Sequence, residues 1–390
     1  MRVGAHLRAL AGRYDVRVVV VPVAGGATAT AWAELHASSA ATVLPGDASA
    51  VRAASARLVA DARWRERLLR AQPFPAPVTY ASPVLAAAVC EAAGGARGAR
   101  VHAIRAYLAP LAVAVAEQTG APWATLDLDD DDEHLLEQEG RHDEAAAYGR
   151  ILETFGALFA WVSLASGADA VRVAQRHGLR SVVLPNSVEL PAGNPRRPHG
   201  PGRRPALLFV ANLTYAPNIE AAELLAGEIL PRVRALAGAD VALEIVGRFQ
   251  SGGGVEELAA IDGVTVHGHV DDLAAAYARA AVVVVPLLRG SGTRIKLLEA
   301  LGAGVPAVTT AVGAAGLGAE DGRHLLIAEG AQALAEAVAR VLLDERLAAA
   351  LARAGRALVE RSFSSDVVGS RLVGLTAALD SGDEPARAEV

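Results

Sequence analysis

The sequence predicts an α/β protein of two domains, each built on a parallel β-sheet. The chain has 390 residues, which is more than one ordinary hydrophobic core accommodates. Short runs rich in β-branched residues alternate with longer helical patterns along the whole chain. The apolar runs are continuous rather than alternating, as in strands buried on both faces. The expected connections are therefore right-handed crossovers between parallel strands.

The first half of the chain supplies five expected strands and begins with a helix-like segment at residues 3–13. A doubly wound domain normally begins with a strand and a glycine-rich turn. We therefore expect residues 1–192 to form a Rossmann-like domain whose first strand is missing from this sequence. The expected strands lie at 16–23, 101–104, 123–128, 160–163 and 181–184, and helical patterns lie at 108–118 and 134–155.

The second half repeats the alternation and predicts a second Rossmann-like domain at residues 206–365. Residues 193–205, GNPRRPHGPGRRP, are dense in Gly, Pro and Arg without periodicity, which is typical of an interdomain linker. Residues 366–390 are expected to form a C-terminal helix that packs back on the first domain, followed by a polar tail. The expected strands lie at 206–210, 241–246, 264–267, 281–286 and 307–310, and helical patterns lie at 219–237, 272–280 and 331–344.

Charge and composition exclude several classes of protein. The net charge of −6 gives no global basic field that would attract nucleic acid. No apolar run approaches the ~20 residues of a membrane-spanning helix, and the N-terminus has no signal-peptide core. The single cysteine, Cys90, excludes an internal disulfide and is expected to be buried. We therefore expect a cytoplasmic protein, and the Ala-rich, Lys-poor composition favours a bacterial genome of high GC content.

The richest segment for chemistry is a glycine-rich turn between an expected strand and an expected helix, at residues 286–300. Parallel sheets bind ligands at the carboxyl ends of their strands, and glycines permit close approach of the backbone. The helix start is expected near Thr293, where exposed amides suit an anion. Arg294 and Lys296 oppose the usual preference for acidic residues at a helix start. This cationic pair makes sense if a diphosphate binds there.

Glu299 follows in an otherwise apolar helical run. Its functional interpretation is a carboxylate that accepts hydrogen bonds from ribose hydroxyls. The alternative is structural, with Lys296 and Glu299 paired at i, i+3 on a solvated face. The pattern Gly-x-Ser-x-Gly and the P-loop are both absent, so a nucleophile-elbow hydrolase and an NTPase have no support.

Residues 290–312, GSGTRIKLLEALGAGVPAVTTAV, resemble the donor-site signature of GT-B glycosyltransferases of group 1, or family 4, in the GSGT-type branch. Residues 209–213 with Pro217 and Asn218, the strand end 246–248, residues 266–270 and residues 184–187 resemble the same family. The resemblance covers essentially all of 160–363 and, more weakly, the first domain. It implies the GT-B fold, in which two Rossmann-like domains with parallel sheets face each other across a cleft.

The resemblance also implies roles for individual residues. Glu299 would hold the ribose, Arg294 and Lys296 would hold the diphosphate in the catalytic step, and residues 268–270 would lie against the base. Many family members carry a donor-sugar glutamate where this chain has Ser291, which leaves the identity of the sugar open. The full set expected to bind the donor is Glu299, Gly290, Ser291, Gly292, Thr293, Arg248, Asn212, His269 and Val270.

The acidic run at residues 127–133 closes an expected strand of the first domain. Its carboxylates either cap the helix that follows, contact an acceptor or bind a metal. Asp129 and Asp130 lie nearest the strand end and, with Arg105 after the strand 101–104, are the acceptor-side candidates. His267 and His269 resemble a catalytic pair, but structural or base-edge roles are the preferred interpretation because no carboxylate partner is evident in the sequence.

These observations predict a glycosyltransferase that moves a sugar from a nucleoside diphosphate sugar to an unidentified small-molecule or envelope acceptor, with retention of configuration. No cofactor or metal is expected. Two rival interpretations remain. One is a GT-B relative that catalyses another sugar-nucleotide reaction such as epimerisation, and the other is a non-catalytic GT-B scaffold. The expected missing strand and Ser291 favour the scaffold, whereas the joint presence of Arg294, Lys296 and Glu299 opposes it.

Overall fold

The computed structural model describes residues 2–20, 40–43, 83–95, 97–191, 204–238, 240–250, 252, 254–289 and 294–383. The chain divides into two compact units. Unit 1 comprises residues Met1–Asn186 and Val368–Val390, and unit 2 comprises Ser187–Val367.

Unit 2 is built on a six-stranded, fully parallel sheet in the spatial order β9-β8-β7-β10-β11-β12. Numbered along unit 2, this is the order 3-2-1-4-5-6 of a doubly wound nucleotide-binding fold. All four residues of β10 are valines and all are buried, as expected for a central strand covered on both faces. The strands are β7 (Ala206–Val210), β8 (Ala242–Val246), β9 (Val264–His267), β10 (Val282–Val285), β11 (Ala307–Thr309) and β12 (Leu326–Ile327).

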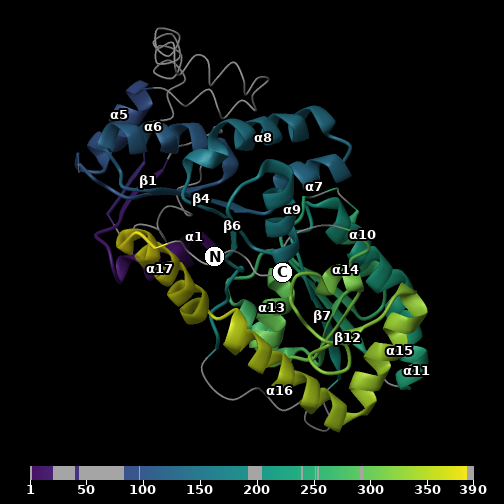
Figure 1. Ribbon diagram of the computed structural model, residues 1–390. Coiled ribbons are helices and arrows are strands. Elements are labelled where there is room, and N and C mark those ends of the chain that lie inside the picture. The colour runs from purple at the N-terminus through teal and green to yellow at the C-terminus, as the bar shows by residue number, and fades with distance from the viewer. Residues whose placement is uncertain are drawn as a thin grey trace. The chain divides into compact units, whose positions relative to one another are not determined.

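Helices cover both faces of this sheet (Figure 1). Helices α11 and α15 pack against each other over one face, and α13 packs with α16 over the other. The helices are α10 (Ala216–Leu224), α11 (Leu230–Ala237), α12 (Leu273–Arg279), α13 (Ile295–Gly302), α14 (Ala311–Ala314), α15 (Gly330–Leu343) and α16 (Glu345–Ser362). A π-helical turn, η4 (Leu225–Ile229), joins α10 to α11, and a 3₁₀ segment, η5 (Val255–Ala260), precedes β9.

Unit 1 contains two parallel sheets among its described residues. The larger has the order β3-β4-β5-β6, and the smaller pairs β1 with β2. The strands are β1 (Arg17–Val20), β2 (Ala40–Val43), β3 (Val101–Ile104), β4 (Ala124–Asp129), β5 (Val162–Leu164) and β6 (Ser181–Val183). The helices are α1 (Arg2–Ala11), α5 (Pro83–Ala92), α6 (Ala109–Thr119), α7 (Asp132–Gln138), α8 (His142–Phe155), α9 (Gly167–His177) and α17 (Ser365–Ser381), with 3₁₀ turns η2 (Ala106–Leu108) and η3 (Gly156–Leu158).

The four-stranded sheet of unit 1 separates two apolar clusters. One lies between the sheet and the helices α5, α6 and α8. The other is formed by Leu10 of α1, Leu372 of α17, Trp161, Val182 and Leu184. Asp380 near the end of α17 accepts hydrogen bonds from Tyr14, Arg100 and Trp123. The last helix of the chain is therefore an integral part of unit 1.

Most expected elements occur within one or two residues of their predicted bounds, but a single helix at 134–155 is wrong. The segment forms two helices, α7 and α8, because Gly140 adopts a left-handed conformation with φ of 74° and ends the first of them. The strands β2 and β12 were not predicted, since Ala40–Val43 and the two residues of β12 give little β signal.

Three other expectations concern the interdomain linker, Cys90 and membrane-spanning helices. Residues 193–203 of the expected linker, which was predicted at 193–205, lie outside the described residues. Cys90 is buried, as expected, and burial raises the pKa of its thiol. A search of the described part of the chain finds no helix that is both long and apolar enough to cross a membrane.

Candidate functional site

The strand order of unit 2 places a topological switch point between β7 and β10. Chain connections leave these two neighbouring strands in opposite directions across the sheet. The turn after β7 leads through Asn212 into α10, and the turn after β10 leads through residues 286–294 into α13. Ligands of doubly wound folds bind at this position.

Lys296, in the first turn of α13, lies beside this switch point and contacts α10 and β7. Its ammonium group donates a 2.7 Å hydrogen bond to Oδ1 of Asn218 in α10 and lies 5.4 Å from the ring centroid of Phe209 in β7. The lysine therefore bridges the two elements that leave the switch point. Burial, together with the positive charge of Arg294, lowers the pKa of Lys296 to about 8.

Arg294 occupies the position just before the first residue of α13, so this helix begins at Ile295 rather than near Thr293 as expected. Arg294 and Lys296 are therefore both within one turn of the positive end of α13. This excess of positive charge disfavours a free helix start and favours a bound anion. The glycine-rich residues expected beside them, Gly290, Ser291, Gly292 and Thr293, lie outside the described residues.

The turn after β7 is held by its own hydrogen bonds. Asn218 donates to the carbonyl oxygen of Asn212, and the Asn212 side chain accepts from the backbone N–H and hydroxyl of Thr214. Gly247, at the end of β8, lies directly against the carbonyl oxygen of Ala211, and a Cβ at this glycine would overlap that oxygen. This close approach fixes the turn that carries the partner of Lys296.

Glu299 lies one turn further along α13 and is half-buried. Its Oε2 accepts a 2.9 Å hydrogen bond from the hydroxyl of Tyr277 in α12. Burial raises the pKa of Glu299. Lys296 and Glu299 have different partners in different helices, so the alternative of an i, i+3 ion pair between them is wrong.

The remaining expected donor residues follow the neighbouring strands β8 and β9. Arg248 and Asn212 are exposed at the carboxyl ends of β8 and β7. His269 is 71% exposed and lies 3.9 Å from Asp271, and Val270 is half-buried. The members of the expected set that the structure describes thus follow the carboxyl ends of neighbouring strands of one sheet, and Lys296 and Glu299 contact side chains of neighbouring elements.

The acidic run of unit 1 has divided roles. Asp127 is fully buried and forms a bidentate ion pair with Arg2 of α1, at 2.6 and 2.7 Å, while Ser163 donates to the same carboxylate. The pKa of Asp127 is lowered to about 2, because the hydrogen bonds and charge of Arg2 outweigh its burial. Asp131 caps α7 by accepting from the backbone N–H of His134. These two carboxylates are structural.

Arg105 and Asp129 are the two non-glycine residues with positive φ among the described residues, at 85° and 71°. Arg105 follows β3 and Asp129 is the last residue of the adjacent strand β4, and their side chains form an ion pair of 3.2 Å. Strained backbone of this kind costs of order 1–3 kcal/mol and tends to cluster at functional sites. The positive φ angles are therefore consistent with Arg105 and Asp129 as acceptor-side candidates.

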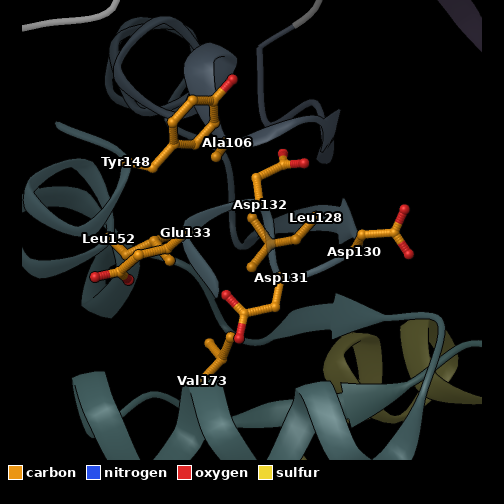
Figure 2. A pocket seen from close by; sticks show the side chains of 9 residues that line it. All are labelled: Ala106, Leu128, Asp130, Asp131, Asp132, Glu133, Tyr148, Leu152 and Val173. Atoms are coloured by element: carbon orange, nitrogen blue, oxygen red, sulfur yellow. The ribbon is translucent and has the colours of Figure 1, made fainter. Parts of the chain in front are cut away.

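Asp130 lines a small hollow together with Asp132 and Tyr148 (Figure 2). Burial raises the pKa of Asp130 to about 7, and the like charges of Asp129 and Asp132 add to the shift. Burial likewise raises the pKa of Asp132 to about 6. Asp130 is therefore only partly ionised at neutral pH. Among the described residues, no group of three or more His, Cys, Asp or Glu side chains is arranged to hold a metal ion.

Sequence reasoning assigned no individual role to three residues that contact the candidate site residues or the buried carboxylate of Asp127. Tyr277 and Phe209 contact Glu299 and Lys296, and Arg2 neutralises Asp127. Tyr277 and Phe209 lie in a predicted helix and a predicted strand, where an apolar or amphipathic residue is normally interpreted as core, and Arg2 precedes the predicted helical segment at 3–13. Their spacing from the residues they contact, 125 positions for Arg2 and Asp127, gave no local signal.

The comparisons agree with this architecture. Residues 204–344 match the family model described as Glycosyl transferases group 1. HepE of Anabaena, in complex with UDP and glucose, is similar with a TM-score of 0.65 and 15% identity over 96% of this chain and 95% of that one. A glycosyltransferase from Rickettsia africae gives 0.67 and 12% identity over 98% and 94%.

Sucrose-phosphate synthase from Thermosynechococcus elongatus is also similar, with a TM-score of 0.64 and 17% identity over 98% of this chain and 93% of that one. No curated protein matches the sequence. The two parallel α/β units define the GT-B fold of the glycosyltransferases. The segment that matches the family model of group 1 glycosyl transferases, residues 204–344, lies within unit 2.

Proposed function

We propose that the protein is a glycosyltransferase that moves a sugar from a nucleoside diphosphate sugar to an acceptor, with retention of anomeric configuration. The observation that carries the proposal is Lys296, a half-buried cation at the switch point of a nucleotide-binding sheet. The position of Glu299 one turn later supports it, as do complexes of the similar protein HepE with UDP and with UDP-glucose.

Lys296 is also the only lysine in a chain that otherwise uses arginine for every strong cation. A lysine ammonium is a compact point charge, whereas an arginine guanidinium is a planar fork. In the proposed reaction Lys296 and Arg294 stabilise the negative charge that develops on the leaving diphosphate, and Glu299 holds the ribose. The glycine-rich residues 290–293 supply further backbone amides to the diphosphate.

Arg248, Asn212, His269 and Val270 complete the donor site around the base in this proposal. Arg105, Asp129 and Asp130 of unit 1 bind the acceptor. The reaction needs no metal or other cofactor, and the enzyme works in the cytoplasm of a bacterium. The partially ionised carboxyl of Asp130 suits it to accept a hydrogen bond from an acceptor hydroxyl.

A panel of UDP-, GDP- and ADP-sugars, read by mass spectrometry, tests the proposed activity. We expect release of one nucleoside diphosphate together with transfer or slow hydrolysis of its sugar, and an anomeric product of retained configuration. Lys296→Ala and Arg294→Ala should each lower the rate by about 10²–10³-fold without unfolding the protein, as the loss of one charge-stabilising contact typically does.

Wild-type rates in both variants would contradict the assignment of the catalytic cations. An isomerised nucleotide sugar without nucleotide release would instead indicate an epimerase. Binding of nucleotide without turnover of any donor would indicate a scaffold.

A further inference from the structure

Tyr277 connects α12 to the two functional residues of α13. Its hydroxyl donates to Oε2 of Glu299 at 2.9 Å and also lies 3.3 Å from the backbone carbonyl oxygen of Lys296. The ring is 4% exposed and packs in the core of unit 2. The position of the hydroxyl beside the first turn of α13 is therefore fixed.

This contact restricts the carboxylate of Glu299. A glutamate side chain on a helix has three rotatable bonds, and ordering it costs conformational entropy unless a partner fixes it. The Tyr277 hydroxyl occupies Oε2, and within the part of the chain that the structure describes Oε1 has no hydrogen-bond partner. One carboxylate oxygen is thus anchored to the protein while the other is available to a ligand.

The hydrogen bond also affects ionisation. Burial raises the pKa of Glu299, whereas donation from Tyr277 lowers it. The tyrosine itself stays protonated, because burial and the neighbouring carboxylate raise the pKa of its hydroxyl. The hydrogen bond from Tyr277 consequently opposes the effect of burial and favours the ionised form of Glu299, which accepts hydrogen bonds from hydroxyl donors.

We propose that Tyr277 is the positioning residue that aims Glu299 at the ribose hydroxyls of the donor and so makes the site selective for ribonucleotides over deoxyribonucleotides. This inference rests on the proposed function, since it assumes that a nucleoside diphosphate binds at α13. Tyr277 acts through Glu299 and does not touch the reacting atoms.

Tyr277→Phe keeps the buried ring and removes only the hydroxyl. Calorimetric titration with UDP, GDP and ADP identifies the nucleotide that binds the wild type, and the matching 2′,3′-dideoxynucleoside diphosphate is the second probe. We expect the variant to bind the ribonucleotide about tenfold more weakly, as expected for one hydrogen bond to a charged group, and to bind the dideoxynucleotide as the wild type does. The weakening should increase as the pH falls, because Glu299 protonates more readily without its donor.

Tyr14→Phe is the matched control, since it removes a 2.7 Å hydroxyl bond to a carboxylate, Asp380, in unit 1. It should leave both affinities unchanged. Glu299→Gln is the second variant, and combining it with Tyr277→Phe should add little to the loss caused by Glu299→Gln alone.

Equal weakening of both probes, or full ribose selectivity in Tyr277→Phe, would overturn the inference while leaving the proposed function in place. A wild type that binds no ribonucleoside diphosphate would overturn both.

Discussion

At the scale of single residues, the proposed diphosphate site depends on the environment of the single lysine, Lys296. Lys296 lies among α13, α10 and β7, with Asn218 as its hydrogen-bond partner and the Phe209 ring beneath it. A half-buried ammonium with a neutral partner carries an uncompensated charge, which is costly unless an anion arrives. Its lowered pKa of about 8 expresses that cost.

This arrangement predicts that the charge of the Lys296 amine changes with pH near neutrality. Because burial lowers the pKa of Lys296 to about 8, the free protein should lose this charge as the pH rises through 8. Bound diphosphate favours the charged form and should raise the pKa. Since the chain has one lysine, the pH dependence of labelling by an amine-reactive reagent, read on the peptide that contains residue 296, measures this pKa directly.

We expect labelling to increase through pH 8 and to be suppressed by the bound nucleoside diphosphate. Lys296→Arg, which cannot be deprotonated in this range, should lose the labelled peptide and show nucleotide affinity independent of pH between 7 and 9. If labelling instead followed an ordinary lysine pKa of ~10.4 and nucleotide had no effect on it, the result would contradict both the burial of Lys296 and the proposed diphosphate site.

The residues that sequence reasoning identified at this site were those with an unusual local context. Arg294 and Lys296 are conspicuous as cations at a helix start, and Glu299 as a carboxylate in an apolar run. Tyr277 has no such context, because its importance arises from a contact across 22 positions that only the packing of α12 on α13 creates. Sequence periodicity predicts that a residue is buried but not which polar atom it meets there.

At the scale of elements, the site depends on the tight turns that follow the parallel strands. The carboxyl end of β8 approaches the turn after β7 so closely that only a glycine fits at position 247. The strands themselves were predictable from continuous buried runs such as the four valines of β10. The division of 134–155 into α7 and α8 was not, since a single Gly140 within a polar stretch is compatible with a continuous helix.

Gly247→Ala tests the role of this close approach. The added methyl group would overlap the carbonyl oxygen of Ala211 and force the β7–α10 turn to move. We expect a loss of about 1–3 kcal/mol in the free energy of unfolding, as for overpacked cores, measured by urea denaturation.

The matched control is Gly227→Ala in the π-helical turn η4, where an added Cβ meets nothing within 4 Å. It should be neutral or stabilise the protein by about 0.5–1 kcal/mol. Equal stability of the two variants would show that the turn after β7 tolerates displacement and is not fixed by β8.

At the scale of the whole molecule, two parallel α/β units and a C-terminal helix that belongs to unit 1 define the GT-B fold. The alternation of strands and helices predicted this class. It did not predict β2 or the ion pair of Arg2 with Asp127, which joins residues far apart in the chain. The doubly wound order of unit 2 supports the proposed nucleotide site but does not identify its base, whereas the proposed acceptor side rests on the strained pair Arg105 and Asp129.

Calorimetric titration of the wild type and of Lys296→Ala with UDP, GDP and ADP tests the central claim most directly. The account predicts that at least one of the three binds the wild type and that Lys296→Ala weakens its binding by about 10–100-fold, as expected for one charge-assisted contact. If none of the three binds the wild type, or if the variant binds with wild-type affinity, the switch point of unit 2 is not a diphosphate site.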